Sequence, residues 1–239
     1  MLFVEPIPIS AIALRLDGGL LAAMGRGFAF FAVGDCSVQW LGTVDVGDRM
    51  NDGACDPLGR FLAGTTTYDR SPRAALYRLD PDLSITPVLA PVTLSNGIDW
   101  SPDGRTLYYV DTPLRRVDAF AYDVERGELG ERRVLVDLAA APGNPDGLSV
   151  DAEGHIWVAI FRGGEIRRYM PDGRLVHTVA VPTPLVTSCC FGGPDLTDLY
   201  ITSSARAMTD EERALNPLAG ALFRYHTDTN GMNAHRFRG

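Results

Sequence analysis

Short β-rich stretches separated by tight turns recur along the whole chain. Ala75–Leu79 and Glu165–Tyr169 are examples of such stretches, and glycine in the intervening turns suits hairpins because it tolerates positive φ. Helical periodicity is nearly absent. One helix start is predicted at Thr209–Glu212, where a Thr and a Glu three residues apart form a capping-box pattern. The pattern predicts an all-β protein.

The turns repeat with a long period. Gly59, Gly104 and Gly154 are 45 and 50 residues apart, and Gly19 lies 40 residues before Gly59. A later copy with a longer turn spans residues 188–202. Each copy consists of a strand, a turn and a strand, and several short strands per unit of 40 to 50 residues are typical of propeller blades. We therefore expect a single β-propeller domain over residues 1–239, with about five blades.

Polar residues occupy the same two positions in three of the repeats. The first position lies three residues before the turn glycine and holds Asp56, Ser101 and Asp151. The second position lies five residues before the first and holds Asn51, Asn96 and Asp146. Equivalent positions of successive blades converge, so oxygen-bearing side chains there would suit a hard divalent cation. Asn and Asp are also common turn residues. The periodicity alone leaves both interpretations open.

Composition limits the function classes. The chain has 239 residues, 46% of them hydrophobic, and a formal net charge of −8, which argues against binding a nucleic-acid backbone. The sequence contains no apolar run long enough to span a membrane and no secretory signal at the N-terminus, so a cytoplasmic protein without nucleic-acid or membrane partners is expected. Its cysteines, predicted to be reduced core thiols, are Cys36, Cys55, Cys189 and Cys190.

Several rival chemistries lack their motifs. The sequence has neither a G-x-S-x-G elbow nor an H-E-x-x-H pair. Its four histidines show no ligand spacing, and His155 is predicted to be structural. Pro-Asp-Gly at 102–104 and 171–173 is interpreted as outer hairpin turns.

Four segments together resemble one known family. Residues 49–65 (RMNDGACDPLGRFLAGT), 94–104 (LSNGIDWSPDG), 145–159 (PDGLSVDAEGHIWVA) and 216–224 (NPLAGALFR) are similar, in order, to signatures of the regucalcin (senescence marker protein), gluconolactonase and sugar-lactonase family. The resemblance implies a six-bladed β-propeller with one divalent metal ion. It also implies hydrolysis of a small-molecule sugar lactone.

The resemblance also implies roles for individual residues. Asn96 and Asp146 correspond to metal ligands, Arg49 and Asn51 to substrate contacts, and Asp69 lies near an acidic substrate contact. A carboxylate beside the ion can accept the proton of the attacking water, which makes Asp146 the candidate catalytic base. The metal is left open among Ca, Zn, Mn, Mg and Fe. The alternative function is a non-catalytic calcium-binding propeller or an inactive truncated scaffold.

One family signature is missing. The G-E-G-P-x-W-D run that carries a third ligand, a Glu, would lie upstream of Met1, and Glu5 is not expected to replace that ligand. The chain is therefore expected to lack its first blade. Residues 1–239 alone are expected to bind metal weakly, to show little lactonase activity and to self-associate through the gap, because a propeller normally closes its ring and leaves no strand edge exposed.

Overall fold

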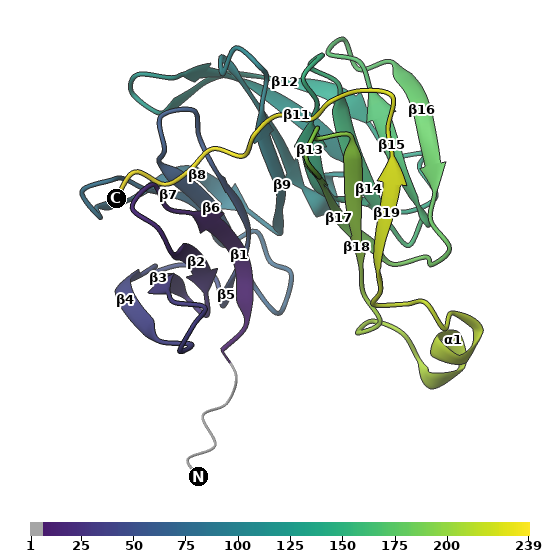
Figure 1. Ribbon diagram of the computed structural model, residues 1–239, viewed down its shortest axis with the longest axis horizontal. Helices are drawn as coiled ribbons and strands as arrows, with labels where there is room; N and C mark the ends of the chain where they lie inside the picture. The colour runs from purple at the N-terminus through teal and green to yellow at the C-terminus, as the bar shows by residue number, and fades with distance from the viewer. Residues whose placement is uncertain (1–6) are drawn as a thin grey trace. The chain divides into compact units, whose positions relative to one another are not determined.

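The computed structural model describes residues 7–239 and consists of five antiparallel sheets with a single short α-helix in that range (Figure 1). The chain forms two compact units, each described by itself below. The first comprises residues 1–95, 124–128 and 234–239, and the second comprises residues 96–123 and 129–233. Glu5 lies outside the described residues.

The first unit contains two four-stranded sheets in which sequential strands are neighbours. The strands of the first sheet are β1 (Ile9–Leu14), β2 (Leu20–Met24), β3 (Gly27–Phe31) and β4 (Val38–Thr43). Those of the second are β5 (Arg49–Cys55), β6 (Phe61–Thr66), β7 (Ala74–Leu79) and β8 (Ile85–Val92). Each sheet corresponds to one sequence repeat and has the up-and-down order of a propeller blade.

The second unit contains the other three sheets, apart from Ser95 and Glu128 at the starts of β9 and β12. Their strands are β9 (Ser95–Trp100), β10 (Thr106–Asp111), β11 (Arg116–Asp123) and β12 (Glu128–Asp137); β13 (Asn144–Val150), β14 (Ile156–Phe161), β15 (Glu165–Tyr169) and β16 (Leu175–Ala180); and β17 (Val186–Gly192), β18 (Asp198–Ser203) and β19 (Leu222–His226). The five sheets confirm the predicted all-β fold of the propeller type with five blades.

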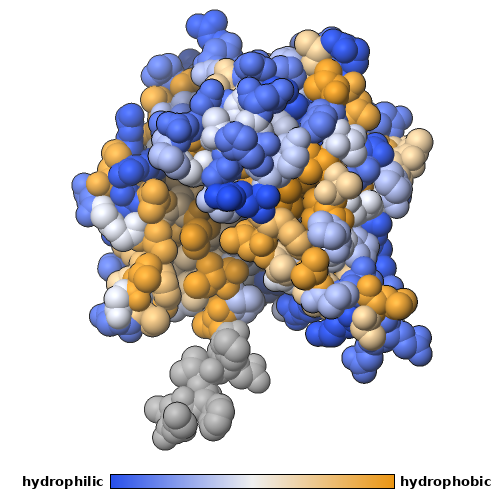
Figure 2. All heavy atoms as spheres, turned by 45° about the vertical axis from the view of Figure 1, so that its right-hand side comes forward, coloured by the Kyte–Doolittle hydropathy of each residue, from blue (hydrophilic) through white to orange (hydrophobic). Residues whose placement is uncertain are grey.

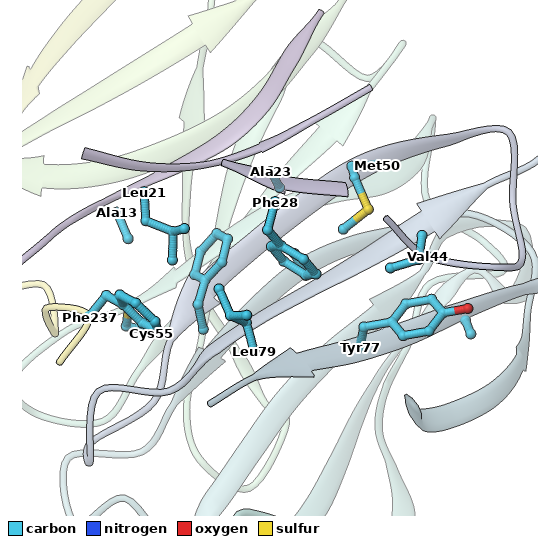
Figure 3. Packing of buried hydrophobic residues seen from close by; sticks show 13 residues of the cluster. Ala13, Leu21, Ala23, Phe28, Val44, Met50, Cys55, Tyr77, Leu79 and Phe237 are labelled. Atoms are coloured by element: carbon cyan, nitrogen blue, oxygen red, sulfur yellow. The ribbon is translucent and has the colours of Figure 1, made fainter. Parts of the chain in front are cut away.

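Aromatic side chains fill the core of the first unit (Figure 3). Phe28 of β3 meets Phe61 of β6 edge to face, with ring centroids 6.0 Å apart. Phe237, close to the C-terminus, is fully buried in the same cluster and pairs with Arg15 in a parallel bridge. Burial of this kind contributes about 1.5–3 kcal/mol per large apolar side chain, so residues from both ends of the sequence stabilise this unit.

The second unit has two hydrophobic clusters between neighbouring sheets. One includes Val110 of β10 and Val158 of β14. The other includes Trp157 of β14, Val186 of β17 and Leu199 of β18. Leu148 and Val150 of β13 belong to the first cluster and Val186 of β17 to the second, so the first strands of these two sheets pack on hydrophobic layers.

The recurring spacing before each turn glycine has a structural cause. Asp56 accepts hydrogen bonds from the main-chain nitrogens of Leu58 and Arg60, at 3.0 and 2.8 Å. Asp151 makes the equivalent bonds to Glu153 and His155, at 3.0 and 2.8 Å. Ser101 closes its own turn by accepting from the Thr106 nitrogen at 3.0 Å. For this position of the repeat the turn interpretation is therefore confirmed, because each side chain satisfies its own hairpin.

The other local predictions have mixed outcomes. Helix α1 (Asp210–Leu215) begins at a Thr209 capping box, as predicted, and the Pro-Asp-Gly segments form turns. The prediction of four core cysteines is wrong for two of them: all four are thiols, but Cys36 and Cys190 are exposed. Cys189 and Cys190 are consecutive in β17, and side chains on a strand alternate between its two faces, so only one of the pair can face the core.

Apolar side chains also reach the surface, as the orange areas in Figure 2 show. On β1 these are Ile9, Ile12 and Leu14, with exposed fractions of 45%, 56% and 49%. Within residues 7–239, every helix is too short or too polar to cross a membrane.

Candidate functional site

Asn96 and the strand that carries Asp146 are joined through one hydroxyl group. The Asn96 Nδ2 donates to Oγ1 of Thr112 at 2.7 Å, and this Oγ1 donates to the main-chain oxygen of Pro145 at 2.9 Å. Asn96 is buried at the start of β9, and Asp146 is half-buried at the start of β13. The structure therefore brings Asn96 next to the peptide that precedes Asp146, and the role of the two residues as metal ligands stays a prediction.

A glycine allows the two strands to approach this closely. A Cβ on Gly97 would lie 2.7 Å from the main-chain oxygen of Asp146 and 2.7 Å from the nitrogen of Leu148. Carbon atoms do not come so near to backbone, so packing requires glycine at position 97. An amide oxygen and a carboxylate at this place are the donor type that hard divalent cations prefer. The residues present thus fit such an ion.

The predicted substrate-binding pair also lies together. Arg49 donates from Nη1 to Oδ1 of Asn51 at 2.6 Å and to the main-chain oxygen of Met50 at 2.9 Å. Asn51 in turn donates from Nδ2 to the main-chain oxygen of Ser95 at 2.7 Å. Both side chains are half-buried at the start of β5. Their mutual contacts hold the guanidinium in one orientation, where its planar donors could meet sugar hydroxyls.

Asp69 occupies the loop that connects β6 to β7. Its carboxylate accepts from the nitrogen and Oγ of Ser71, at 3.0 and 2.7 Å, and forms an exposed ion pair with Arg73 at 2.7 Å. The hydrogen bonds from Ser71 hold the pKa of Asp69 below its usual range. The carboxylate of Asp69, the predicted substrate contact, therefore bonds residues of its own loop.

Two carboxylates on the first strands were not anticipated from the sequence. Asp52 in β5 and Asp99 in β9 are half-buried. Desolvation by burial raises the pKa of each to about 6, although main-chain hydrogen bonds oppose the shift. For Asp99 these bonds come from the nitrogens of Trp100 and Val150, at 2.9 and 2.8 Å. Asp52 directly follows Asn51, and Asp99 lies three residues after Asn96. This closeness to a predicted site asparagine is the sequence signal that could have indicated each carboxylate.

A second acidic cluster lies at the opposite end of β13. Asp151, Glu153 and His155 bring ligand atoms within 4.8 Å of one another. The guanidinium of Arg168 already lies among them, 2.7 Å from Asp151 and 2.9 Å from Glu153. Trp157 donates to Asp151 as well, at 3.0 Å. An arginine thus supplies positive charge to this cluster. His155 contacts Asp151 through its main-chain nitrogen and its ring, and its structural role stays a prediction.

Comparison with known proteins gives a consistent result. A profile of the SMP-30/gluconolactonase/LRE-like region matches residues 2–205. Regucalcin from Xenopus laevis is 41% identical over 227 residues, which cover 91% of this chain and 76% of the relative.

Solved structures agree with the sequence relatives. A calcium-binding protein, regucalcin, from Agrobacterium tumefaciens superposes with a TM-score of 0.93 at 30% identity, covering 98% of this chain and 81% of the other. A luciferin-regenerating enzyme gives a TM-score of 0.87 at 29% identity, covering 97% and 82%.

Proposed function

Because this chain belongs to the SMP-30/gluconolactonase/LRE-like family, which includes gluconolactonases, we propose that it hydrolyses a sugar lactone to the sugar acid with one divalent metal ion. The observation that carries the proposal is the bridge through Thr112, which joins Asn96 to the beginning of β13, directly before Asp146. Asn96 and Asp146 each offer an oxygen donor to a metal ion. Because the matched family includes gluconolactonases, lactone hydrolysis is the reaction that we assign to this pair.

Asn96 and Asp146 would hold the ion through an amide oxygen and a carboxylate. When bound, a divalent ion acts as a Lewis acid that polarises the lactone carbonyl and stabilises negative charge on its oxygen. Calcium suits this donor set, since it takes carboxylate and amide oxygens in flexible geometry. It is also the ion named for the Agrobacterium relative. Zinc, manganese, magnesium and iron are the other candidates.

Asp146 is proposed as the general base. A carboxylate at this position accepts the proton of the attacking water as the water adds to the carbonyl carbon. The ring C–O bond then breaks, and the ring oxygen takes the proton from Asp146 to become a hydroxyl group of the sugar acid. Arg49, oriented by Asn51 and by the oxygen of Met50, would donate to hydroxyl groups of the sugar. Asp69 is proposed as a further substrate contact, and binding there would compete with its ion pair to Arg73.

The experiment that tests the proposal is hydrolysis of an aldonolactone, followed by acid release at constant pH, with each divalent metal and with chelator. Activity should require metal. Asp146→Asn should abolish turnover and leave the thermal unfolding temperature nearly unchanged, because the amide keeps the shape and removes the base. Asp137→Asn is the matched control, an exposed aspartate whose side chain bonds only the nearby Ala139 nitrogen among the bonds described.

Two outcomes would contradict the proposal. Full activity in Asp146→Asn would remove this residue from the mechanism. Tight calcium binding without hydrolysis of any aldonolactone would favour the second candidate, a non-catalytic calcium-binding propeller, which the likeness to the calcium-binding Agrobacterium protein supports.

A further inference from the structure

The turn after β10 lies against the segment that leads into Asp146. It consists of a single 3-10 turn, Thr112–Leu114, followed by Arg115 in the left-handed conformation with φ of 50°. Arg115 donates from Nη2 to the main-chain oxygens of Ala141 and Gly143, at 2.9 and 3.1 Å, and from Nη1 to Oδ1 of Asn144 at 3.2 Å. These bonds fix the turn relative to the beginning of β13.

Within this turn the Thr112 hydroxyl makes two bonds of opposite sense. It accepts from Nδ2 of Asn96 at 2.7 Å and donates to the oxygen of Pro145 at 2.9 Å. Because Nδ2 of Asn96 bonds Thr112, Oδ1 of the same amide points away from Thr112. The Pro145 bond holds the peptide group that immediately precedes Asp146.

We propose that Thr112 is a positioning residue for the metal site, which it serves by orienting the Asn96 side chain and the peptide before Asp146 with one hydroxyl. This inference rests on the proposed function. Groups that orient metal ligands in this way change metal affinity or activity by about 10- to 100-fold when they are removed. The bridge requires a hydroxyl group at position 112, because its one oxygen accepts a hydrogen bond from Asn96 and donates one to Pro145.

Threonine has two informative substitutions. Thr112→Val keeps the volume and the branched Cβ and removes the hydroxyl, so Asn96 and Pro145 each lose a partner. Thr112→Ser keeps the hydroxyl and removes a methyl group. A purely structural role in packing would be disturbed by serine at least as much as by valine, whereas a role through the hydroxyl would be lost only in valine.

The first measurement is calorimetric titration of calcium alone into the wild-type chain and both variants. We expect Thr112→Val to weaken calcium binding by about 10- to 100-fold and Thr112→Ser to remain within a few-fold of wild type. Unfolding in chelator checks that both variants fold. Wild-type affinity in Thr112→Val would overturn the proposal, as would an equal loss in the two variants.

A second measurement separates this proposal from the proposed function. The side-chain amide signals of Asn96 in the metal-free protein report its orientation, and we expect slow hydrogen exchange in wild type and in Thr112→Ser, with fast exchange and shifted signals in Thr112→Val. If the wild-type chain binds no metal, the proposed metal-dependent function fails while these signals still decide whether Thr112 orients Asn96. Unchanged signals in Thr112→Val would overturn the positioning role.

Discussion

Asp151 lies fully buried with its carboxylate 2.7 Å from the guanidinium of Arg168. The aspartate directly follows β13, and the arginine reaches it from β15, the third strand of the same sheet. The pair ties the turn to the outer part of the blade. This position recurs as Asp56 with Arg60 in the first unit, where the charged groups are 2.5 Å apart. A buried charge pair therefore occurs in two of the blades.

Asp151→Asn should destabilise the protein strongly. The substitution removes the one buried carboxylate among the three that Arg168 contacts, and breaking such a buried pair costs about 3–5 kcal/mol. Urea unfolding in chelator measures the loss. The matched control is Asp172→Asn, an exposed turn aspartate whose carboxylate accepts from the Arg174 nitrogen at 2.9 Å, for which little change is expected. Equal stability of the two variants would show that the buried pair contributes nothing.

The raised pKa of Asp99 predicts a specific dependence of stability on pH. Burial raises this pKa from 3.8 to about 6, so between these values the folded state keeps a proton that the unfolded state releases. Stability should therefore fall as the pH rises from about 4 to about 6, by on the order of 1–3 kcal/mol. Asp99→Asn should reduce this fall by about half when urea unfolding is measured across that range in chelator, because Asp52, whose pKa is also raised to about 6, contributes the rest.

Asp103→Asn provides the control for this pH dependence. Asp103 lies in the turn after β9, and its hydrogen bond from Ser101 lowers its pKa. Its substitution should leave the fall between pH 4 and 6 in place. Parallel curves for wild type and Asp99→Asn would contradict the assignment of the fall to Asp99.

The exposed apolar side chains of β1 predict self-association. Ile12 is 56% exposed, with Ile9 and Leu14 exposed on the same strand, and clustered exposed apolar residues commonly mark an interaction surface. We expect residues 1–239 to elute at a concentration-dependent mass in size-exclusion chromatography with light scattering, and Ile12→Lys to shift the protein towards the monomer. Val33→Lys replaces an apolar side chain of similar exposure, 66%, outside β1. Val33→Lys should elute with the same mass as the wild-type chain. If the wild-type chain is a monomer at all concentrations, the prediction is wrong.

Features carried by neighbouring residues could be predicted from the sequence. The turn glycines, the Thr209 capping box and the turn role of Asp56 depend on contacts within a few residues, and the structure has all three. The pairing of Arg49 with Asn51 is local in the same sense, since the two residues are two positions apart.

Features that depend on distant partners could not be predicted. Thr112 contacts residues 16 and 33 positions away along the chain, and nothing in its own neighbourhood indicates either partner. The pKa of Asp99 is set by burial, which the pattern around it does not reveal. The exposure of Cys190 could not be predicted, because the sequence around it does not show which face of its strand is turned to solvent.

The bridge between Arg15 and Phe237 also constrains the order of folding during synthesis. The first blade is translated early, but the aromatic ring that completes its core comes from residue 237, which also receives a hydrogen bond from the Leu16 nitrogen at 2.9 Å and donates one to the Leu14 oxygen at 2.9 Å. The ribosome must therefore translate and release Phe237 before the first blade can reach its final packing. Until then the nascent chain carries an unfinished hydrophobic surface, and transiently exposed surface of this kind favours aggregation.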